Sequence, residues 1–103
     1  EKIDEICQIP DIDVVFVGPA DMSQSLGIPG KSRDPRVVEL ACKVIETAEK
    51  YGKAGGINVA NVQDMEMYLS HGARYIMYGS DTGIFAKGLK AAVAQFEPYQ
   101  SKK

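Results

Sequence analysis

Asp13-Val-Val-Phe-Val17, followed at once by Gly18-Pro19, is the stretch that decides the fold. A short run of β-branched and aromatic residues that is apolar on both faces is typical of a buried parallel strand. The Gly-Pro pair marks the end of the run, because these two residues are the strongest local breakers of regular structure. We therefore expect a strand over 13–17 and a long loop from Gly18 to Arg33.

Helical and strand patterns alternate on both sides of this strand. Asp34 is expected to cap a helix that starts at Pro35 and ends before Gly52, because Asp, Pro and Gly favour these three positions. Apolar residues recur along it at three- and four-residue steps, as on the buried face of a helix. The other expected elements are a helix over 2–8, a strand over 53–59, a helix between Asn61 and Gly72, a strand over 75–78, and a last helix from Ser80 or Asp81 to Pro98, before a polar tail over 99–103.

This alternation predicts an α/β fold with parallel strands joined by right-handed crossovers. Three strands laid side by side would place both crossover helices on one face of the sheet and leave the other face bare. Either the sheet is doubly wound and the flanking helices cover the second face, or it is an arc of a (β/α)8 barrel. A complete barrel needs about 250 residues. On the second interpretation, residues 1–103 are the C-terminal part of a barrel whose upstream strands are missing from this segment.

Composition and charge exclude several classes of protein. Among the 103 residues, 12 are Lys or Arg and 14 are Asp or Glu, which gives a formal net charge of −2. Basic residues do not cluster, which argues against nucleic-acid and membrane-surface partners, and no apolar run approaches the roughly 20 residues that span a bilayer. Cys7 and Cys42 form no metal-binding pattern, so we expect reduced thiols in a cytoplasmic protein.

The carboxyl ends of the strands are where ligands bind in both architectures. Asp21 lies just beyond the first strand, after the Gly18-Pro19 corner that can fix its direction. Its carboxylate is the kind of ligand that Mg²⁺ or Mn²⁺ prefers. The alternative is that Asp21 only caps a turn or a short helix.

Three further positions carry less specific signals. Ser80 and Asp81 are expected to cap the last helix, although Gly55-Gly56 and Gly79-Ser80 also fit loosely the phosphate loops of a barrel. His71 ends a helix on the opposite rim, where we expect it to bond the last carbonyls of that helix. Cys42, on a helix face, is expected to be a buried structural thiol.

Five segments together resemble one known family. They are DVVFVGPADMS at 13–23, SLG at 25–27, GKAGGI at 52–57, GARY at 72–75 and GSD at 79–81. The pattern is similar to that of the HpcH/HpaI aldolases, the metal-dependent pyruvate aldolases, and it runs over essentially the whole chain. Met22 stands where Leu is commoner in the family, which bears on the preference for the substrate side chain and not on the chemistry.

The resemblance implies a (β/α)8 barrel in which the three strands are the sixth, seventh and eighth. It implies a divalent metal ion, Mg²⁺ or Mn²⁺ and in some members Co²⁺, held by Asp21 and by a Glu upstream of Glu1. Ala20 would contact the substrate, and Gly18 and Pro19 would shape the same corner. The His base and an Arg would also lie upstream, so the resemblance places no catalytic residue in this segment.

The implied function is a lyase reaction, the class II aldol cleavage of 4-hydroxy-2-oxo acids through a pyruvate enolate, with an aldehyde as the second product. The implied assembly is a homo-oligomer, a hexamer in which subunits exchange the C-terminal helix. Two alternatives stay open: a phosphate-binding (β/α)8 lyase or isomerase, and a non-catalytic α/β assembly module built around the last helix. We expect residues 1–103 alone to be inactive.

Overall fold

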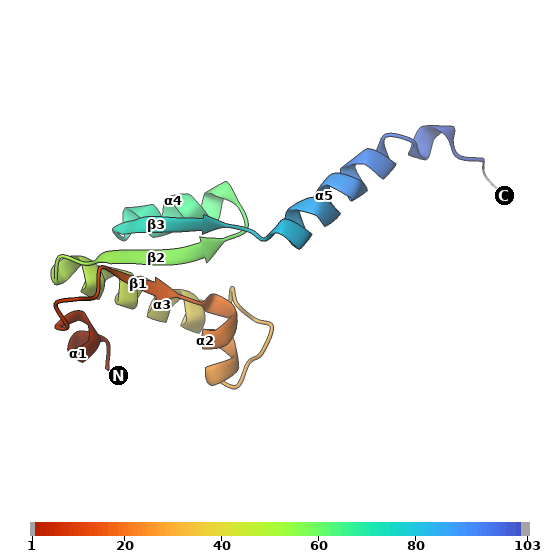
Figure 1. Cartoon of the computed structure of the whole chain (residues 1–103). Helices are drawn as coiled ribbons and strands as arrows, with labels where there is room; N and C mark the ends of the chain where they lie inside the picture. The colour runs from red at the N-terminus through yellow and green to blue at the C-terminus, as the bar shows by residue number, and fades with distance from the viewer. Residues whose placement is uncertain (1, 102–103) are drawn as a thin grey trace.

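The structure is a computed structural model that describes residues 2–101 (Figure 1). Its order of helices and strands matches the expected alternation, with one additional helix directly after the first strand. The elements are α1 (Ile3–Cys7), β1 (Val14–Val17), α2 (Pro19–Ser25), α3 (Pro35–Lys50), β2 (Ala54–Val59), α4 (Val62–Ser70), β3 (Ala73–Tyr78), α5 (Asp81–Ala94) and a 3₁₀ turn, η1 (Glu97–Tyr99).

The described residues form one three-stranded parallel sheet in the order β1-β2-β3. Its register places Phe16 beside Gly56, which in turn pairs with Tyr75. Helix α3 packs on β1 and β2, and α4 packs on β2 and β3, so both crossover helices cover the same face, as expected (Figure 1). The carboxyl ends of all three strands therefore meet at one edge of the sheet.

The hydrophobic core lies between this covered face and the two helices. Ile45 of α3 and Ile57 of β2 are fully buried in this core, and Tyr68 of α4 belongs to the same cluster. Helix α3 approaches β2 closely because Gly55 has no side chain. A Cβ at that position would lie 2.9 Å from Cα of Ile45, which is closer than packed carbon atoms tolerate.

The opposite face of the sheet is apolar and uncovered by any described residue. Phe16, Tyr75 and Met77 are 41%, 49% and 47% exposed there. The rings of Phe16 and Tyr75 meet edge to face, with centroids 6.0 Å apart, above Gly56, where a Cβ would lie 2.8 Å from the Phe16 ring. Parallel sheets are normally covered on both faces, and within the described residues this sheet is covered on one face alone.

Helix α5 extends away from the sheet instead of packing on it (Figure 1). The molecule measures 63 × 27 × 21 Å and its radius of gyration is 17.8 Å, against about 13 Å for a compact chain of this length. None of its residues is buried. Phe85 in its second turn and Phe96 just beyond its end are 70% and 65% exposed. None of the helices in the described part is both long and apolar enough to cross a membrane.

The expected helix caps are confirmed. Asp34 accepts a hydrogen bond from the backbone N–H of Arg36 at 3.0 Å, and Asn61 accepts one from that of Asp64 at 2.7 Å. Gly52 and Gly72 follow their helices with φ of +73° and +98°, the left-handed region that favours glycine.

Two expectations about helices were wrong. The segment 18–33 was expected to be all loop, but its first part is α2, with Gly18 at the N-cap and Pro19 in the first turn. This is the same start signal that predicted α3, and the abundance of Gly, Pro and Ser obscured it. The last helix was expected to reach Pro98, but α5 ends at Ala94 and Pro98 lies inside η1. Of the expected polar tail, residues 102–103 lie outside the described residues.

Candidate functional site

The corner after β1 is built by backbone turns and one buried hydroxyl. The chain turns directly from Val17 into α2, whose first bond runs from the N–H of Met22 to the carbonyl oxygen of Gly18 at 2.9 Å. Ser23 is fully buried, and its Oγ donates to the carbonyl oxygen of Ala20 at 2.6 Å. This bond anchors the short helix. The sequence interpretation gave Ser23 no role, because its bond depends on the turn of α2, which was not predicted.

Asp21 stands at this corner with its carboxylate folded back over the strand end. Its Oδ2 lies 3.0 Å from the point where a Cβ of Gly18 would be, so glycine at position 18 makes room for the carboxylate. Asp21 is exposed, and within residues 2–101 its carboxylate oxygens make no hydrogen bond or ion pair. Both oxygens are therefore free to bind a ligand, which an Asp that served only as a cap would not offer.

The chemistry of this corner fits part of a site for a divalent cation. A free, exposed carboxylate suits Mg²⁺ or Mn²⁺. Within residues 2–101 no three His, Cys, Asp or Glu side chains lie close enough together to hold a metal ion. The described residues therefore do not form a complete metal site by themselves.

A cavity of about 570 Å³ lies beside this corner, at the carboxyl ends of β1 and β2. Gly18, Pro19 and Ala20 line it from the corner after β1, and Asn58 of β2 and Asn61 at the start of α4 line it as well. The structure thus brings three of the four expected binding residues to one cavity, with Asp21 beside it on the same turn of helix.

The pairing of Arg33 with Asp64 in the lining of the cavity was not foreseen from the sequence. Arg33 donates from Nη2 to Oδ1 of Asp64 at 2.8 Å, and Asn61 donates from Nδ2 to Oδ2 of the same carboxylate at 3.1 Å. Tyr68 also lines the cavity, and burial raises the pKa of its hydroxyl to about 12. Arg33 and Asp64 are 31 residues apart, so no local pattern could have paired them.

The corner after β3 is a helix cap. Ser80 accepts a hydrogen bond from the N–H of Gly83 at 3.1 Å, as expected, and Asp81 accepts one from that of Thr82 at 2.7 Å. Asn58 ties this corner to β2 by donating to the carbonyl oxygen of Gly79 at 3.2 Å. The expected capping role of Ser80 is therefore confirmed.

The glycines that fitted phosphate loops have a different role. Gly55 lies under α3 and Gly56 under the Phe16 ring, inside the strand and not in a loop at its carboxyl end. Assigning Gly55-Gly56 to a phosphate loop was therefore wrong, because their lack of a Cβ serves close packing. The carboxylate of Asp81 at the other corner would also repel a phosphate.

His71 and Cys42 lie away from the cavity. His71 follows α4 at the opposite rim, as expected, but it bonds Oε1 of Glu46 through Nδ1 at 2.6 Å instead of the last carbonyls of its own helix. It therefore links α4 to α3. Cys42 is buried, as expected, and burial raises the pKa of its thiol, so the reactive thiolate is disfavoured.

Comparisons with known proteins agree with this geometry. The family model described as HpcH/HpaI aldolase/citrate lyase matches residues 1–88. Among curated proteins, the 4-hydroxy-2-oxo-heptane-1,7-dioate aldolase of Klebsiella pneumoniae is 35% identical over 96 residues, which cover 93% of this chain and 36% of that protein. The 4-hydroxy-2-oxovalerate aldolase of Rhodococcus jostii is 36% identical over 96 residues, 92% of this chain and 37% of that protein.

Solved structures of other proteins also resemble this chain. The citrate synthase SbnG has a TM-score of 0.84 at 30% identity and is matched over 94% of this chain and 40% of its own. An HpcH/HpaI aldolase from Desulfitobacterium hafniense has a TM-score of 0.81 at 28% identity, over 93% of this chain and 38% of its own. The chain thus spans little more than a third of the length of the curated relatives it matches.

Proposed function

The chain belongs to the HpcH/HpaI aldolase/citrate lyase family, and from this premise we propose that the protein carrying it is a carbon–carbon lyase that cleaves 4-hydroxy-2-oxo acids. The free carboxylate of Asp21, folded back over Gly18 beside the strand-end cavity, is the observation that carries the proposal. The names of the Klebsiella and Rhodococcus relatives support the substrate class.

We propose further that residues 1–103 are strands six to eight of a (β/α)8 barrel with their helices. The apolar face that carries Phe16, Tyr75 and Met77 would then face the barrel interior, where side chains from the other strands pack against it. The match to only 38–40% of the solved relatives is of the size expected for such a part.

Each residue of the corner has a distinct role in the proposed reaction. Asp21 would hold a divalent ion, Mg²⁺, Mn²⁺ or Co²⁺, together with a Glu from outside the described residues. When bound, such an ion supplies positive charge that offsets the negative charge developing on the 2-oxo group as the carbon–carbon bond breaks. Ala20 presents its backbone to the substrate, and Gly18 and Pro19 fix the turn that aims Asp21. The base that moves the proton is expected outside this chain.

The proposed assembly is a homo-oligomer in which α5 packs on a second copy. Its support is the helix itself, which extends from the sheet with its apolar side chains exposed along its whole length. The alternative occupant of the apolar surface is the barrel of the same subunit.

The activity is tested by pyruvate release from 4-hydroxy-2-oxoheptanedioate and 4-hydroxy-2-oxopentanoate, with the full-length protein before and after chelation. We expect cleavage of at least one of the two acids, its loss on chelation and its recovery with Mg²⁺ or Mn²⁺. Cleavage that survives complete removal of divalent ions would contradict the metal dependence. Release of no pyruvate from either acid would contradict the lyase itself.

A further inference from the structure

The two aldolase relatives act on acids that differ at the far end of the molecule, since one substrate is a 1,7-dioate and the other a valerate. We infer that Arg33 is a specificity-determining residue that binds the distal carboxylate of the substrate, which makes a dicarboxylic 4-hydroxy-2-oxo acid the favoured class. This inference rests on the proposed function and names the substrate of the same site.

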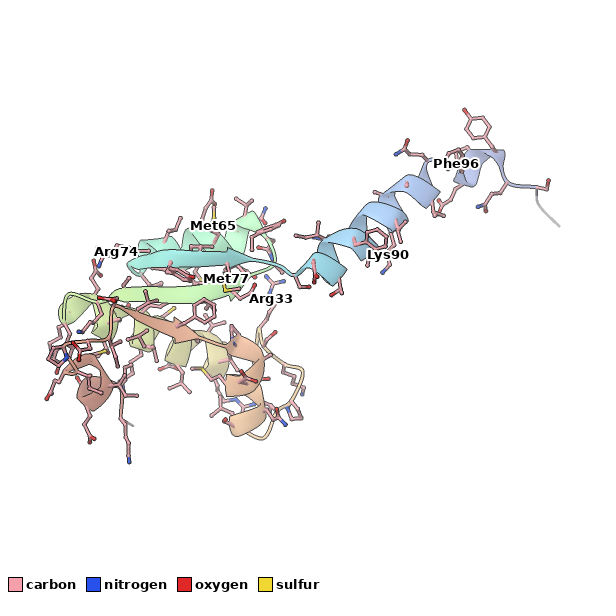
Figure 2. The ribbon with its side chains drawn as sticks, in the orientation of Figure 1. Arg33, Met65, Arg74, Met77, Lys90 and Phe96 are labelled. Carbon is pink, nitrogen blue, oxygen red and sulfur yellow. The ribbon has the colours of Figure 1, made fainter. Side chains whose placement is uncertain are left out.

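Arg33 lies on the correct side of the molecule for this role. Figure 2 shows it beyond the carboxyl ends of the strands, at the opposite end of the sheet from Arg74. It belongs to the segment between α2 and α3 and lines the same cavity as Ala20, the residue before Asp21. A molecule whose 2-oxo acid end lies at the Asp21 corner could therefore extend across the cavity toward Arg33.

Among the described residues that line this cavity, Arg33 is the one that carries a positive charge. Tyr68 also lines the cavity and is only 5% exposed, and its hydroxyl is the one polar group of its side chain. That hydroxyl makes no hydrogen bond within residues 2–101, and a phenol in this state can donate to an acceptor in the cavity.

The Arg33 guanidinium is oriented by a carboxylate that is itself fixed. The carboxylate of Asp64 accepts hydrogen bonds from Nη2 of Arg33 at 2.8 Å and from Nδ2 of Asn61 at 3.1 Å. The backbone N–H of Asp64 donates to Oδ1 of Asn61 at 2.7 Å. The Asp64 side chain is 23% exposed, whereas that of Arg33 is 73% exposed. Asp64 therefore holds one nitrogen of Arg33 and leaves the rest of the side chain open.

The remaining donors of Arg33 match a carboxylate. Its Nε and Nη1 make no hydrogen bond to any described residue, and Nη2 carries a second N–H. One pair of N–H groups, on Nη2 and a neighbouring nitrogen, is therefore left for the two oxygens of a carboxylate. The negative charge of Asp64 offsets the positive charge of Arg33. The hydrogen bonds of the guanidinium therefore supply most of the binding energy for a substrate carboxylate. A neutral substrate end would leave them unused.

Equilibrium binding of two uncleavable acids tests the inference. 2-Oxoheptanedioate and 2-oxoheptanoate share the 2-oxo acid end and the chain length, lack the 4-hydroxyl that aldol cleavage requires, and differ in the distal carboxylate. Calorimetric titration of the full-length protein with Mg²⁺ present should show the diacid binding about tenfold more tightly, the effect of one hydrogen-bonded charge near solvent.

Arg33→Gln should abolish this preference and leave the affinity for 2-oxoheptanoate unchanged, whereas Arg33→Lys should keep part of it. Arg36→Gln is the matched control, because Arg36 is also exposed and paired with an aspartate, at 3.0 Å from Asp34, but lines no part of the cavity. This control should bind both acids like the wild type.

Four results would overturn the inference. If the wild type bound the two acids equally, or if Arg33→Gln kept the preference, the distal carboxylate would be bound elsewhere or not at all, while the proposed function would stand. If Arg33→Gln lowered the affinity for both acids alike, Arg33 would only hold the loop in place. If neither acid bound to the wild type, the proposed function would fail and the inference with it.

Discussion

Gly55 and Gly56 are neighbours in β2 that make room on opposite faces of the sheet. A side chain on Gly55 would meet the backbone of α3, and one on Gly56 would meet the Phe16 ring and the backbone of Tyr75. Neither the helix-side face nor the bare face therefore has room for a side chain at these two positions. A face built this closely is expected to be covered in the complete protein.

Gly55→Ala should destabilise the protein, because the new Cβ would lie 2.9 Å from Cα of Ile45 and α3 would have to shift. Overpacking of this kind costs about 1–3 kcal/mol of the free energy of unfolding. Chemical denaturation of the full-length protein measures the change. Gly88→Ala, on α5 with no atom within 4 Å, is the control and should be neutral or slightly stabilising. Equal stability of the two variants would contradict the packing described for β2.

Tyr68 makes the stability depend on pH in the alkaline range. Burial raises the pKa of its hydroxyl to about 12 in the folded protein, against about 10 in the unfolded chain. The neutral hydroxyl is thus favoured by folding, so its contribution is complete below pH 10 and is lost as the pH rises toward 12. Tyr68→Phe should flatten the decline of the free energy of unfolding over this range. A decline that is unchanged in Tyr68→Phe would show that the hydroxyl titrates normally.

Among the elements, those with strong local signals were predicted closely from the sequence. Asp34-Pro35 and Asn61 mark their helices, and the glycines that follow have the left-handed backbone that ends a helix. Helix α2 was missed because Gly18-Pro19 was interpreted as the end of a strand, although the same pair also starts a helix. The partners of Arg33 and His71 were missed because they depend on how α3 and α4 pack.

Helix α5 is the element whose packing partner is proposed and not described. Phe85→Ser in α5 and Phe96→Ser just beyond its end remove two highly exposed aromatic side chains and should dissociate the oligomer, which sedimentation velocity of the full-length protein would show as a loss of mass. Lys90→Ser, on the same helix (Figure 2), is the control and should leave the assembly intact. If the double Phe variant stayed folded with an unchanged mass, the helix would not be an interface between subunits.

At the scale of the whole molecule, the described chain leaves an apolar sheet face and an apolar helix uncovered. Large exposed patches of this kind promote association. Residues 1–103 expressed alone should therefore self-associate and unfold without a cooperative transition, as followed by sedimentation and thermal denaturation. A cooperative monomer that releases pyruvate would contradict the assignment of this chain to strands six to eight of a barrel.

At the corner that carries Asp21, a glycine, a short helix and a strand end together place one free carboxylate beside the cavity. Asp81 follows β3 in a similar way, but its carboxylate is engaged by the N–H of Thr82. The two aspartates therefore form a matched pair for substitution. Asp21→Asn keeps the size of the side chain and removes the charge that a hard cation prefers.

Titration of Mn²⁺ into full-length Asp21→Asn and Asp81→Asn, with the rate of pyruvate release measured at each point, tests the central claim most directly. We predict that Asp21→Asn binds the ion more weakly and turns over about a hundredfold more slowly or worse, since each ~1.4 kcal/mol of lost stabilisation is tenfold in rate. Asp81→Asn should bind and cleave like the wild type and lose only some stability. If Asp21→Asn bound Mn²⁺ and released pyruvate at the wild-type rate, the assignment of this corner as the metal site would be wrong.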